Sequence, residues 1–531
     1  MFGVTRQPCD DGVIRSAGTE TPCAKKAEKY VLIAAILGSS ITFIDGTVVN
    51  VVLPVLQREL GADVSQIQWI VELYALMLSA LILVGGSLGD RLGRRKVFMA
   101  GVAIFALASV WCGVSPDVDQ LIFARGIQGI GAAMLVPGSL ALISANYRKE
   151  KRGRAIGTWS GFTSIAAGIG PVLGGWLAES ISWRWIFFIN IPLSIAVLIV
   201  SWLFVPESRD EDTRGRVDWL GAGLATLGLG GVVYGLIESN SQGFTAPQVY
   251  ISLTVGAAAL ATFILAELRA KNPMMPLALF RSNTFSGANI LTLFLYAALS
   301  GLLFFLPFML IQVHGYAASS AGAALLPFVI TMFVLSRWAG GLVTRYGSKL
   351  PLTVGPLVTA GGFTLFGLLG GNGGGYWTAF FPPIMVMSLG MAISVAPLTT
   401  TVMGAVEQRH AGIASGINNA VSRVAGLLAV AAFGVIMLLN FQRGLEQRLG
   451  SMDLSPAQRT GIISQGNDLL NLKIPEGVDA GTSDTIRTAV RDSFVSGFRL
   501  ITFTSAGLAV LSALAAWLLI SGKVKENTEP Q

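Results

Sequence analysis

Several ionisable side chains lie inside long apolar runs of this sequence, where charge is costly. Asp45 is in the middle of the first run, Glu72 is a few residues into the second, and Arg125 is early in the fourth. An ionised carboxylate at mid-membrane costs roughly 3 kcal/mol or more, so Asp45 must face a protein interior or a cavity. Desolvation favours its protonated form, as proton carriage requires. The alternative is a structural acid that ties two helices together.

Glu72 and Trp69 share one face of the second run because they are three residues apart. An acid beside an aromatic ring suits an organic cation, and Glu72 could equally be a second proton site. In the alternative interpretation, Glu72 is wetted near the outer mouth of the protein and Trp69 is an aromatic anchor at the membrane interface.

Two arginines inside apolar runs each need a partner or water, because a guanidinium stays charged. An arginine near Asp45 would stabilise the carboxylate and release it on moving away, which predicts a conformational switch for proton uptake. Arg423 is about twelve residues into the thirteenth run, and its alternative role is a tether between helices. The neighbouring Asn418 and Asn419 either line a substrate cavity with Trp69, Glu72 and Arg423 or bond between helices.

The composition indicates which elements hold these residues. Of 531 residues, 53% are apolar and 13% are charged, against about 25% charged in soluble domains. Apolar runs of about 20 residues, long enough to cross a bilayer, recur along the chain. They predict an all-α membrane protein with about fourteen spanning helices, near 30–53, 66–88, 97–114, 121–143, 154–178, 185–205, 217–238, 248–268, 287–311, 319–343, 351–370, 378–402, 411–438 and 497–521.

Lysine and arginine in the loops predict the orientation. Outside the long outer segment at about 439–496, 25 lysines and arginines fall on alternate segments, which puts both termini in the cytoplasm, and the short outer loops hold only Arg58 and Arg184. The net charge of +7 therefore reflects topology and requires no nucleic-acid partner. The first run has no small-residue cleavage site near its end, so we interpret it as a retained helix rather than a secretory signal.

The runs group into a symmetric arrangement. We expect a cytoplasmic tail over 1–29, a six-helix bundle over 30–205, a linker with two extra spanning helices over 206–284, a second six-helix bundle over 285–521, and a tail over 522–531. A polar outer segment, about 439–496, forms either a small ordered hairpin or cap over the outer mouth, or a disordered loop. Parallel repeats of this kind place the substrate site between the two halves, near mid-membrane.

A charged turn joins the second and third runs. It contains Gly86, Asp90, Arg91, Gly93 and Arg94, and a related pattern recurs at 340–349 with Thr344 in place of the acid. The glycines allow a tight turn and close helix approach, and the charges could form a latch that closes the inner face. The alternative is that the basic residues only signal topology.

The fifth run is rich in glycine. Small residues permit backbone contact with another helix, and a proline frees a carbonyl and kinks the helix. The residues are Gly161, Gly170, Pro171, Gly174 and Gly175. Such a helix can bend as two bundles rock, although ordinary tight packing is the alternative.

These motifs resemble the major facilitator superfamily over about residues 30–520. The turn at 86–95 is similar to its signature between helices two and three, and Leu121–Gly131 is similar to that of its fourth helix. The segment 161–175 resembles a motif of proton-coupled exporters, and 43–54 and 183–192 resemble fourteen-helix drug:proton antiporters. The resemblance implies two six-helix bundles with two extra helices, and a role for Arg125 in proton coupling. Thr344 departs from the pattern, and the acid at Glu72 is typical of exporters of quaternary ammonium compounds.

The resemblance implies export of lipophilic, often cationic, compounds by alternating access, driven by the proton gradient without a cofactor. We expect a multi-pass monomer in a bacterial inner membrane, whose partners are the small-molecule substrate, protons and the bilayer; a periplasmic adaptor is undetermined. The sequence has no phosphate-binding loop, no nucleophile with a base at a meaningful spacing and no metal-ligand spacing, so we expect no enzyme and no metal. The alternatives are an exporter of an endogenous metabolite such as an antibiotic, lipid or siderophore, a proton-coupled importer, and a receptor or assembly subunit without transport.

Overall fold

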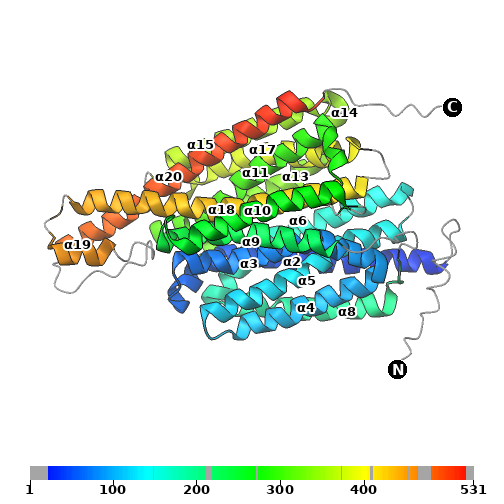
Figure 1. The fold of residues 1–531 in the computed structure, drawn as a ribbon, viewed down its shortest axis with the longest axis horizontal. Helices are drawn as coiled ribbons and strands as arrows, with labels where there is room; N and C mark the ends of the chain where they lie inside the picture. The colour runs from blue at the N-terminus through cyan, green and yellow to red at the C-terminus, as the bar shows by residue number, and fades with distance from the viewer. Residues whose placement is uncertain are drawn as a thin grey trace. The chain divides into compact units, whose positions relative to one another are not determined.

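The computed structural model describes residues 22–147, 149–209, 218–270, 273, 275–371, 374–406, 411–450, 452, 454–463 and 480–521. Within these ranges the regular structure is entirely helical, and fourteen helices are long and apolar enough to cross a membrane. The prediction of an all-α membrane protein is therefore confirmed (Figure 1). Helices suit apolar runs because a bilayer core has no water to satisfy the backbone, so each segment must pair its own amides and carbonyls.

The chain forms two compact units. Unit 1 comprises Met1–Val49, Leu73–Gly230 and Ala258–Met274, and unit 2 comprises Asn50–Glu72, Gly231–Ala257 and Met275–Gln531. Four helices contribute to both units, namely α2 (Pro22–Leu60), α3 (Val64–Leu92), α9 (Trp219–Gln242) and α10 (Pro247–Arg269). The domain boundaries expected from the sequence stay a prediction.

The remaining helices of unit 1 are α4 (Arg94–Val114), α5 (Val118–Asn146), α6 (Lys149–Ser180), α7 (Trp185–Phe188) and α8 (Asn190–Phe204). Glycines let α4 and α5 meet backbone to backbone. A Cβ added to Gly101 would lie 2.8 Å from the Gly131 carbonyl oxygen, and one added to Gly131 would lie 2.6 Å from the Phe105 nitrogen. Small residues at such crossings are the usual means of helix association in lipid.

Unit 2 contains η1 (Leu277–Arg281), α11 (Asn283–Phe308), η2 (Met309–Val313), α12 (Ala318–Ala323), α13 (Leu326–Gly340), α14 (Leu342–Tyr346), α15 (Lys349–Leu369), α16 (Tyr376–Ala379), α17 (Phe381–Gly404), α18 (Ala411–Gly450), α19 (Pro456–Ile463) and α20 (Ala480–Leu519). The run expected at 319–343 is divided among α12, α13 and α14. Pro327 explains the break before α13, because proline suits the first turn of a helix but not its interior.

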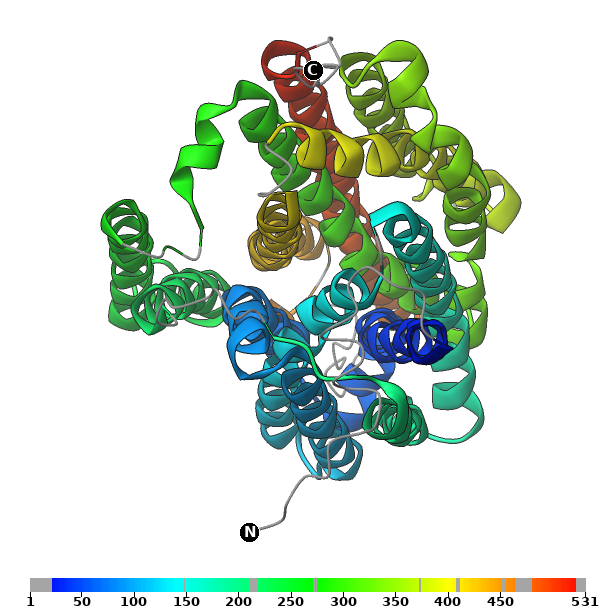
Figure 2. The ribbon, with the colours of Figure 1, turned by 90° about the vertical axis from the view of Figure 1, so that its right-hand side faces the viewer.

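The extra helices α9 and α10 lie side by side in both views (Figures 1 and 2). They approach closely at glycines in each unit. In unit 1 a Cβ on Gly228 would lie 2.7 Å from Leu260 side-chain atoms, and in unit 2 a Cβ on Gly231 would lie 2.9 Å from Gly256 Cα. Much of the outer surface of α10 is apolar and exposed, as expected for a helix in contact with lipid.

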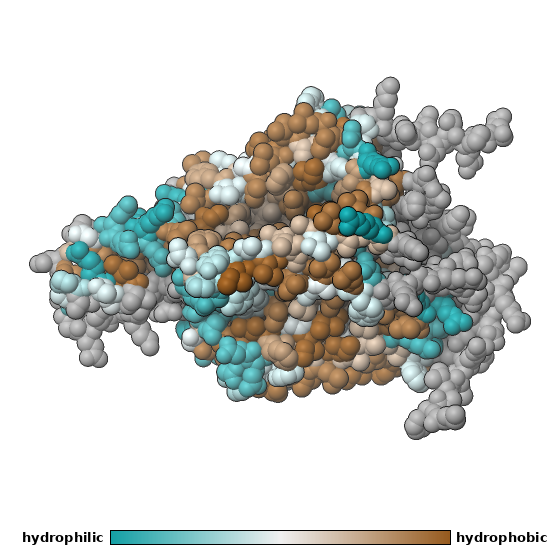
Figure 3. Space-filling view, in the orientation of Figure 1, coloured by the Kyte–Doolittle hydropathy of each residue, from teal (hydrophilic) through white to brown (hydrophobic). Residues whose placement is uncertain are grey.

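The long segment before the last helix is an ordered helical hairpin in the residues that the structure describes. The ends of α18 and α20 extend beyond the runs expected at 411–438 and 497–521. Arg448 Nη1 on α18 donates to Ser493 Oγ on α20 at 3.3 Å. Nearby apolar side chains on both helices are buried, namely Phe441, Leu445, Leu449, Ile486 and Phe494. The α19 helix begins with a reciprocal cap between Ser455 and Gln458. This part of the molecule carries many hydrophilic side chains (Figure 3). The hairpin interpretation is confirmed there, and its position over a mouth stays a prediction.

Candidate functional site

Asp45 is fully buried in unit 1, and three side chains donate hydrogen bonds to its carboxylate. Arg125 Nη1 lies 2.5 Å from Asp45 Oδ2, Gln128 Nε2 lies 2.9 Å from Oδ1, and Asn190 Nδ2 lies 3.0 Å from Oδ1. The four residues come from α2, α5 and α8 and are all essentially inaccessible to solvent. The structure therefore brings together the acid and the arginine that the sequence singled out.

This network stabilises a negative carboxylate inside the bundle. Charge-assisted hydrogen bonds are about twice as strong as neutral ones, and Asp45 accepts one from a guanidinium and two from amides. Arg125 is also placed over the Tyr74 ring, 4.2 Å from its centroid, an arrangement that favours a cation. Protonation of Asp45 would remove the negative partner of Arg125, so ion-pair separation and proton uptake are linked by geometry.

Sequence reasoning did not assign roles to Gln128, Asn190 or Ser109. Gln128 bridges the network: its Nε2 also donates to Ser109 Oγ at 2.8 Å, and its Oε1 accepts from Arg125 at 2.6 Å. The sequence contains one signal for Gln128 and one for Asn190. Gln128 is three residues after Arg125 and so shares its helix face, and Asn190 is an amide at the start of a strongly apolar helix.

The glycines of α6 face the helix that carries Asp45. A Cβ added to Gly170 would overlap Thr47 Oγ1, and one added to Gly174 would lie 3.0 Å from Val48 Cγ1 and 3.1 Å from the Val48 carbonyl oxygen. Pro171 and Gly175 are buried in α6 and Gly161 is half-buried. Any side chain at Gly170 would therefore displace the side chain of Thr47, which lies two residues from Asp45 on α2. A bending role for α6 stays a prediction.

An acid that sequence reasoning missed holds the turn between α3 and α4. Gly93 has φ +110°, and an added Cβ would lie 2.6 Å from Glu207 Oε1. The Arg95 amide donates to Glu207 Oε1 at 3.0 Å, and the Arg94 amide donates to the Ser208 carbonyl at 2.8 Å. Arg95 Nε lies 3.8 Å from Glu207 Oε2. A carboxylate at a helix N-terminus satisfies free amides and the helix dipole.

The sequence placed this latch on Asp90, Arg91 and Arg94, but the described contacts run through Arg95 and Glu207. The Asp90 side chain lies outside the described residues. Arg91 and Arg94 are half-buried, and Gly86 lies near Pro137 on α5, 3.6 Å from an added Cβ. Glu207 was detectable as an acid directly after the sixth apolar run.

A phenol ties the start of the first spanning helix to the C-terminal end of α5. The Tyr147 hydroxyl donates to the Glu28 carbonyl at 2.5 Å. Burial, and then the nearby Glu28 charge, raise the pKa of Tyr147 to about 12. The hydroxyl is therefore a permanent donor at neutral pH, and this contact is independent of proton transfer.

Glu72 lies in unit 2 and is fully buried. Among the described residues neither of its carboxylate oxygens has a hydrogen-bond partner. This burial does not fit an acid wetted near the outer mouth. Trp69 lies one turn earlier, with its ring 6.2 Å from that of Tyr234 on α9, so in this structure it is packed between helices.

The asparagines predicted to line a cavity divide into two groups. Asn418 Nδ2 donates to Thr292 Oγ1 at 2.7 Å and to Asn289 Oδ1 at 3.2 Å, so it ties α18 to α11. Asn419 is exposed and Arg423 is half-buried. Asn418 therefore serves helix contact in this structure.

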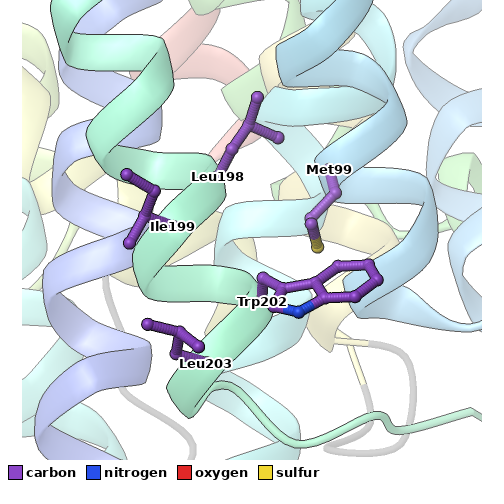
Figure 4. Close-up of a pocket in the computed structure, with 5 residues that line it drawn as sticks. All are labelled: Met99, Leu198, Ile199, Trp202 and Leu203. Atoms are coloured by element: carbon purple, nitrogen blue, oxygen red, sulfur yellow. The ribbon is translucent and has the colours of Figure 1, made fainter. Parts of the chain in front are cut away.

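An apolar groove lies on the surface of unit 1 between α4 and α8 (Figure 4). It has a volume of about 410 Å³ and is lined by Met99, Leu198, Ile199, Trp202 and Leu203. Trp202 is 62% exposed, and none of the five lining side chains is charged. Its chemistry is that of a lipid-facing surface and not of a site for a charged substrate. Within the described ranges, no three His, Cys, Asp or Glu side chains group as metal ligands.

Comparison with known proteins identifies the family. The model of the Major Facilitator Superfamily matches residues 35–430. The chain is 32% identical to the multidrug resistance protein Stp of Mycobacterium tuberculosis over 498 residues, 93% of this chain and 92% of that protein. It is 30% identical over 504 residues to the tetracenomycin C resistance and export protein of Streptomyces glaucescens, covering 94% and 93% of the two chains. The methylenomycin A resistance protein of Bacillus subtilis is 34% identical over 411 residues, 77% of this chain and 88% of that protein.

Solved structures agree on the fold. A bacterial homologue of the human lysosomal transporter Spinster, in an inward-facing state, superposes with a TM-score of 0.64 at 18% identity, covering 94% of this chain and 98% of that chain. A D-xylose–proton symporter superposes with a TM-score of 0.58 at 14% identity, covering 93% and 98%. The family match and the curated relatives place the chain in the class of membrane transporters. The chain belongs to the Major Facilitator Superfamily, as its motifs indicated.

Proposed function

We propose that this protein exports lipophilic toxic compounds, often cationic, in exchange for protons. Relatives named for multidrug resistance and for antibiotic resistance and export, which cover most of the chain, support export of such compounds. The glycine-rich α6 beside Asp45 supports antiport. The protein works in the cytoplasmic membrane as a monomer with both termini inside, and the proton gradient replaces any cofactor.

The observation that carries the proposal is the buried Asp45–Arg125 ion pair, at 2.5 Å. A carboxylate in this position exchanges a proton only when the cation withdraws or water enters, because its acceptor sites are otherwise occupied by Arg125, Gln128 and Asn190. A movement of α5 against α2 would withdraw Arg125 from Asp45 and let water reach the carboxylate in the same step. Alternating access to the two sides would then carry one proton inward on Asp45 for each cycle.

Glu72 is the second acid of the proposal. An ionised carboxylate with no partner in a buried site is costly, so Glu72 either binds a proton or pairs with an arriving organic cation. Either role makes substrate and proton compete for buried carboxylates. With more than one proton per cation, the membrane potential would assist export.

The test is gradient-driven efflux in inverted vesicles with a panel of dyes and quaternary amines. Asp45→Asn keeps the size of the side chain but removes its charge, and we expect loss of gradient-dependent transport. Glu72→Gln should impair cationic substrates most. The matched control is Glu59→Gln, which neutralises an exposed acid at the end of α2. Full gradient-dependent efflux by both Asp45→Asn and Glu72→Gln would refute the assignment of the coupling acids.

A second candidate is export of an endogenous metabolite. It is favoured by a relative that is named for both resistance to and export of tetracenomycin C. Under this alternative, Glu72→Gln would leave resistance to cationic drugs unchanged. Deletion of the gene would instead cause a native small molecule to accumulate inside the cells.

A further inference from the structure

The side-chain amide of Gln68 connects the first turns of α3 to α18. Gln68 is fully buried, and its Nε2 donates to the Val430 carbonyl at 3.0 Å. Gly434, one turn further along α18, provides the space for this side chain. A Cβ added to Gly434 would overlap the Gln68 amide nitrogen and lie 2.6 Å from its Cδ. Gln68 therefore occupies a notch that exists only because residue 434 is glycine.

Other contacts hold the same end of α3 in place within unit 2. Ser65 Oγ lies 3.5 Å from the Ile237 carbonyl on α9, and the Trp69 ring packs at 6.2 Å from Tyr234 on the same helix. The neighbouring end of α2 reaches η2, where Gln312 Nε2 donates to Gln57 Oε1 at 3.4 Å. This end of α3 therefore contacts α18 on one side and α9 on another, and these contacts, with that between α2 and η2, form the helical junction.

Glu72 lies one turn deeper than this junction. It is four residues after Gln68 and therefore on the same face of α3, about 6 Å further along the helix axis. Its carboxylate is buried and has no hydrogen-bond partner among the described residues. The positive-inside distribution predicts that the Gln68 end of α3 is the outer end. A separation of α3 from α18 that began at this end would therefore reach Gln68 before Glu72.

We propose that Gln68, seated in the Gly434 notch, is an outer gate that controls access to Glu72. Opening breaks the hydrogen bond from Gln68 to the Val430 carbonyl and separates α3 from α18. Gln68 is a positioning residue: it binds neither proton nor substrate but decides when Glu72 is open to the outside. The role of this gate in transport rests on the proposed function. The contacts that form the gate do not depend on what Glu72 binds.

The test measures access without requiring transport. In a variant with Cys9, Cys23 and Cys112 replaced by serine, Glu72→Cys is exposed to a membrane-impermeant thiol reagent added outside intact cells. We expect slow labelling with Gly434 present and labelling several-fold faster with Gly434→Val, because the added side chain expels Gln68. The matched control is Gly507→Ala on α20, where an added Cβ meets nothing within 4 Å.

A second substitution separates gating from misfolding. Gln68→Ala removes the gating amide without adding bulk beside α18, so it should also label several-fold faster than the variant that retains Gln68. Equal labelling with Gly434 and with Gly434→Val, or slow labelling with Gln68→Ala, would overturn the gate. If the gate behaves as expected while Glu72→Gln still exports all substrates, the gate stands and the role proposed for Glu72 fails.

Discussion

Removal of one partner of the Asp45–Arg125 pair should destabilise the protein far more than removal of both. Arg125→Met keeps the length of the side chain but leaves a buried carboxylate without its cation. Both groups are at most 1% exposed and lie 2.5 Å apart, so solvent cannot replace the lost interaction. Breaking a buried pair in this way typically costs about 3–5 kcal/mol.

The double variant tests whether the two charges interact in the folded protein. In Asp45→Asn with Arg125→Met neither charge remains, so the cost should be smaller than the sum of the single costs, with an interaction energy of about 0.5–3 kcal/mol. The assay is equilibrium unfolding of the purified protein in mixed detergent micelles, followed by tryptophan fluorescence, for the parent, both single variants and the double variant.

A matched control uses the exposed pair Arg487 and Asp484, whose charged atoms lie 3.9 Å apart with both side chains at least 74% exposed. The corresponding substitutions Arg487→Met and Asp484→Asn should be additive, because exposed pairs contribute little. Additive costs at Asp45 and Arg125 as well would refute the reasoning, since they would show that the two groups do not interact in the folded protein.

Three further predictions follow from local geometry. Gly93→Ala forces φ +110° on a residue with a Cβ and pushes against Glu207; we expect a loss of about 1–3 kcal/mol in unfolding experiments, and Glu207→Gln should recover none of it. Gly170→Val should abolish efflux because its side chain overlaps Thr47, with partial recovery in the pair Gly170→Val and Thr47→Gly. Burial lowers the pKa of His314 below 6.5, so the folded state binds a proton less readily than the unfolded state and thermal stability should fall as pH drops below about 6.5; His314→Gln should remove that fall.

Much of the fold was predictable from the sequence because the bilayer imposes a one-dimensional rule. Every spanning segment must be a helix of about 20 apolar residues, so length and hydropathy suffice to locate it. The main errors concern ends and breaks, such as the division of 319–343 and the extension of α20 back to Ala480. Those depend on proline, on polar caps and on packing beyond the membrane, which hydropathy does not record.

Candidate residues were predictable for the same reason, and their partners were not. Asp45, Glu72 and Arg125 stand out because each interrupts an apolar run at a high cost in solvation. The motif glycines near 86–95 and 161–175 were visible as well. Glu207, by contrast, sits in an ordinary polar connection, and its contact with Arg95 links residues far apart in the chain.

The sequence by itself determined the membrane class, the helix count, the expected orientation and the charged residues that need an explanation. Only the tertiary structure decided that Asp45 is bound by Arg125, Gln128 and Asn190, and that Glu72 is buried without such partners in the described part of the chain. The physical reason is that hydropathy is a property of each segment alone. Hydrogen bonds between helices depend instead on the rotation and depth at which separate segments pack, and no local pattern encodes these.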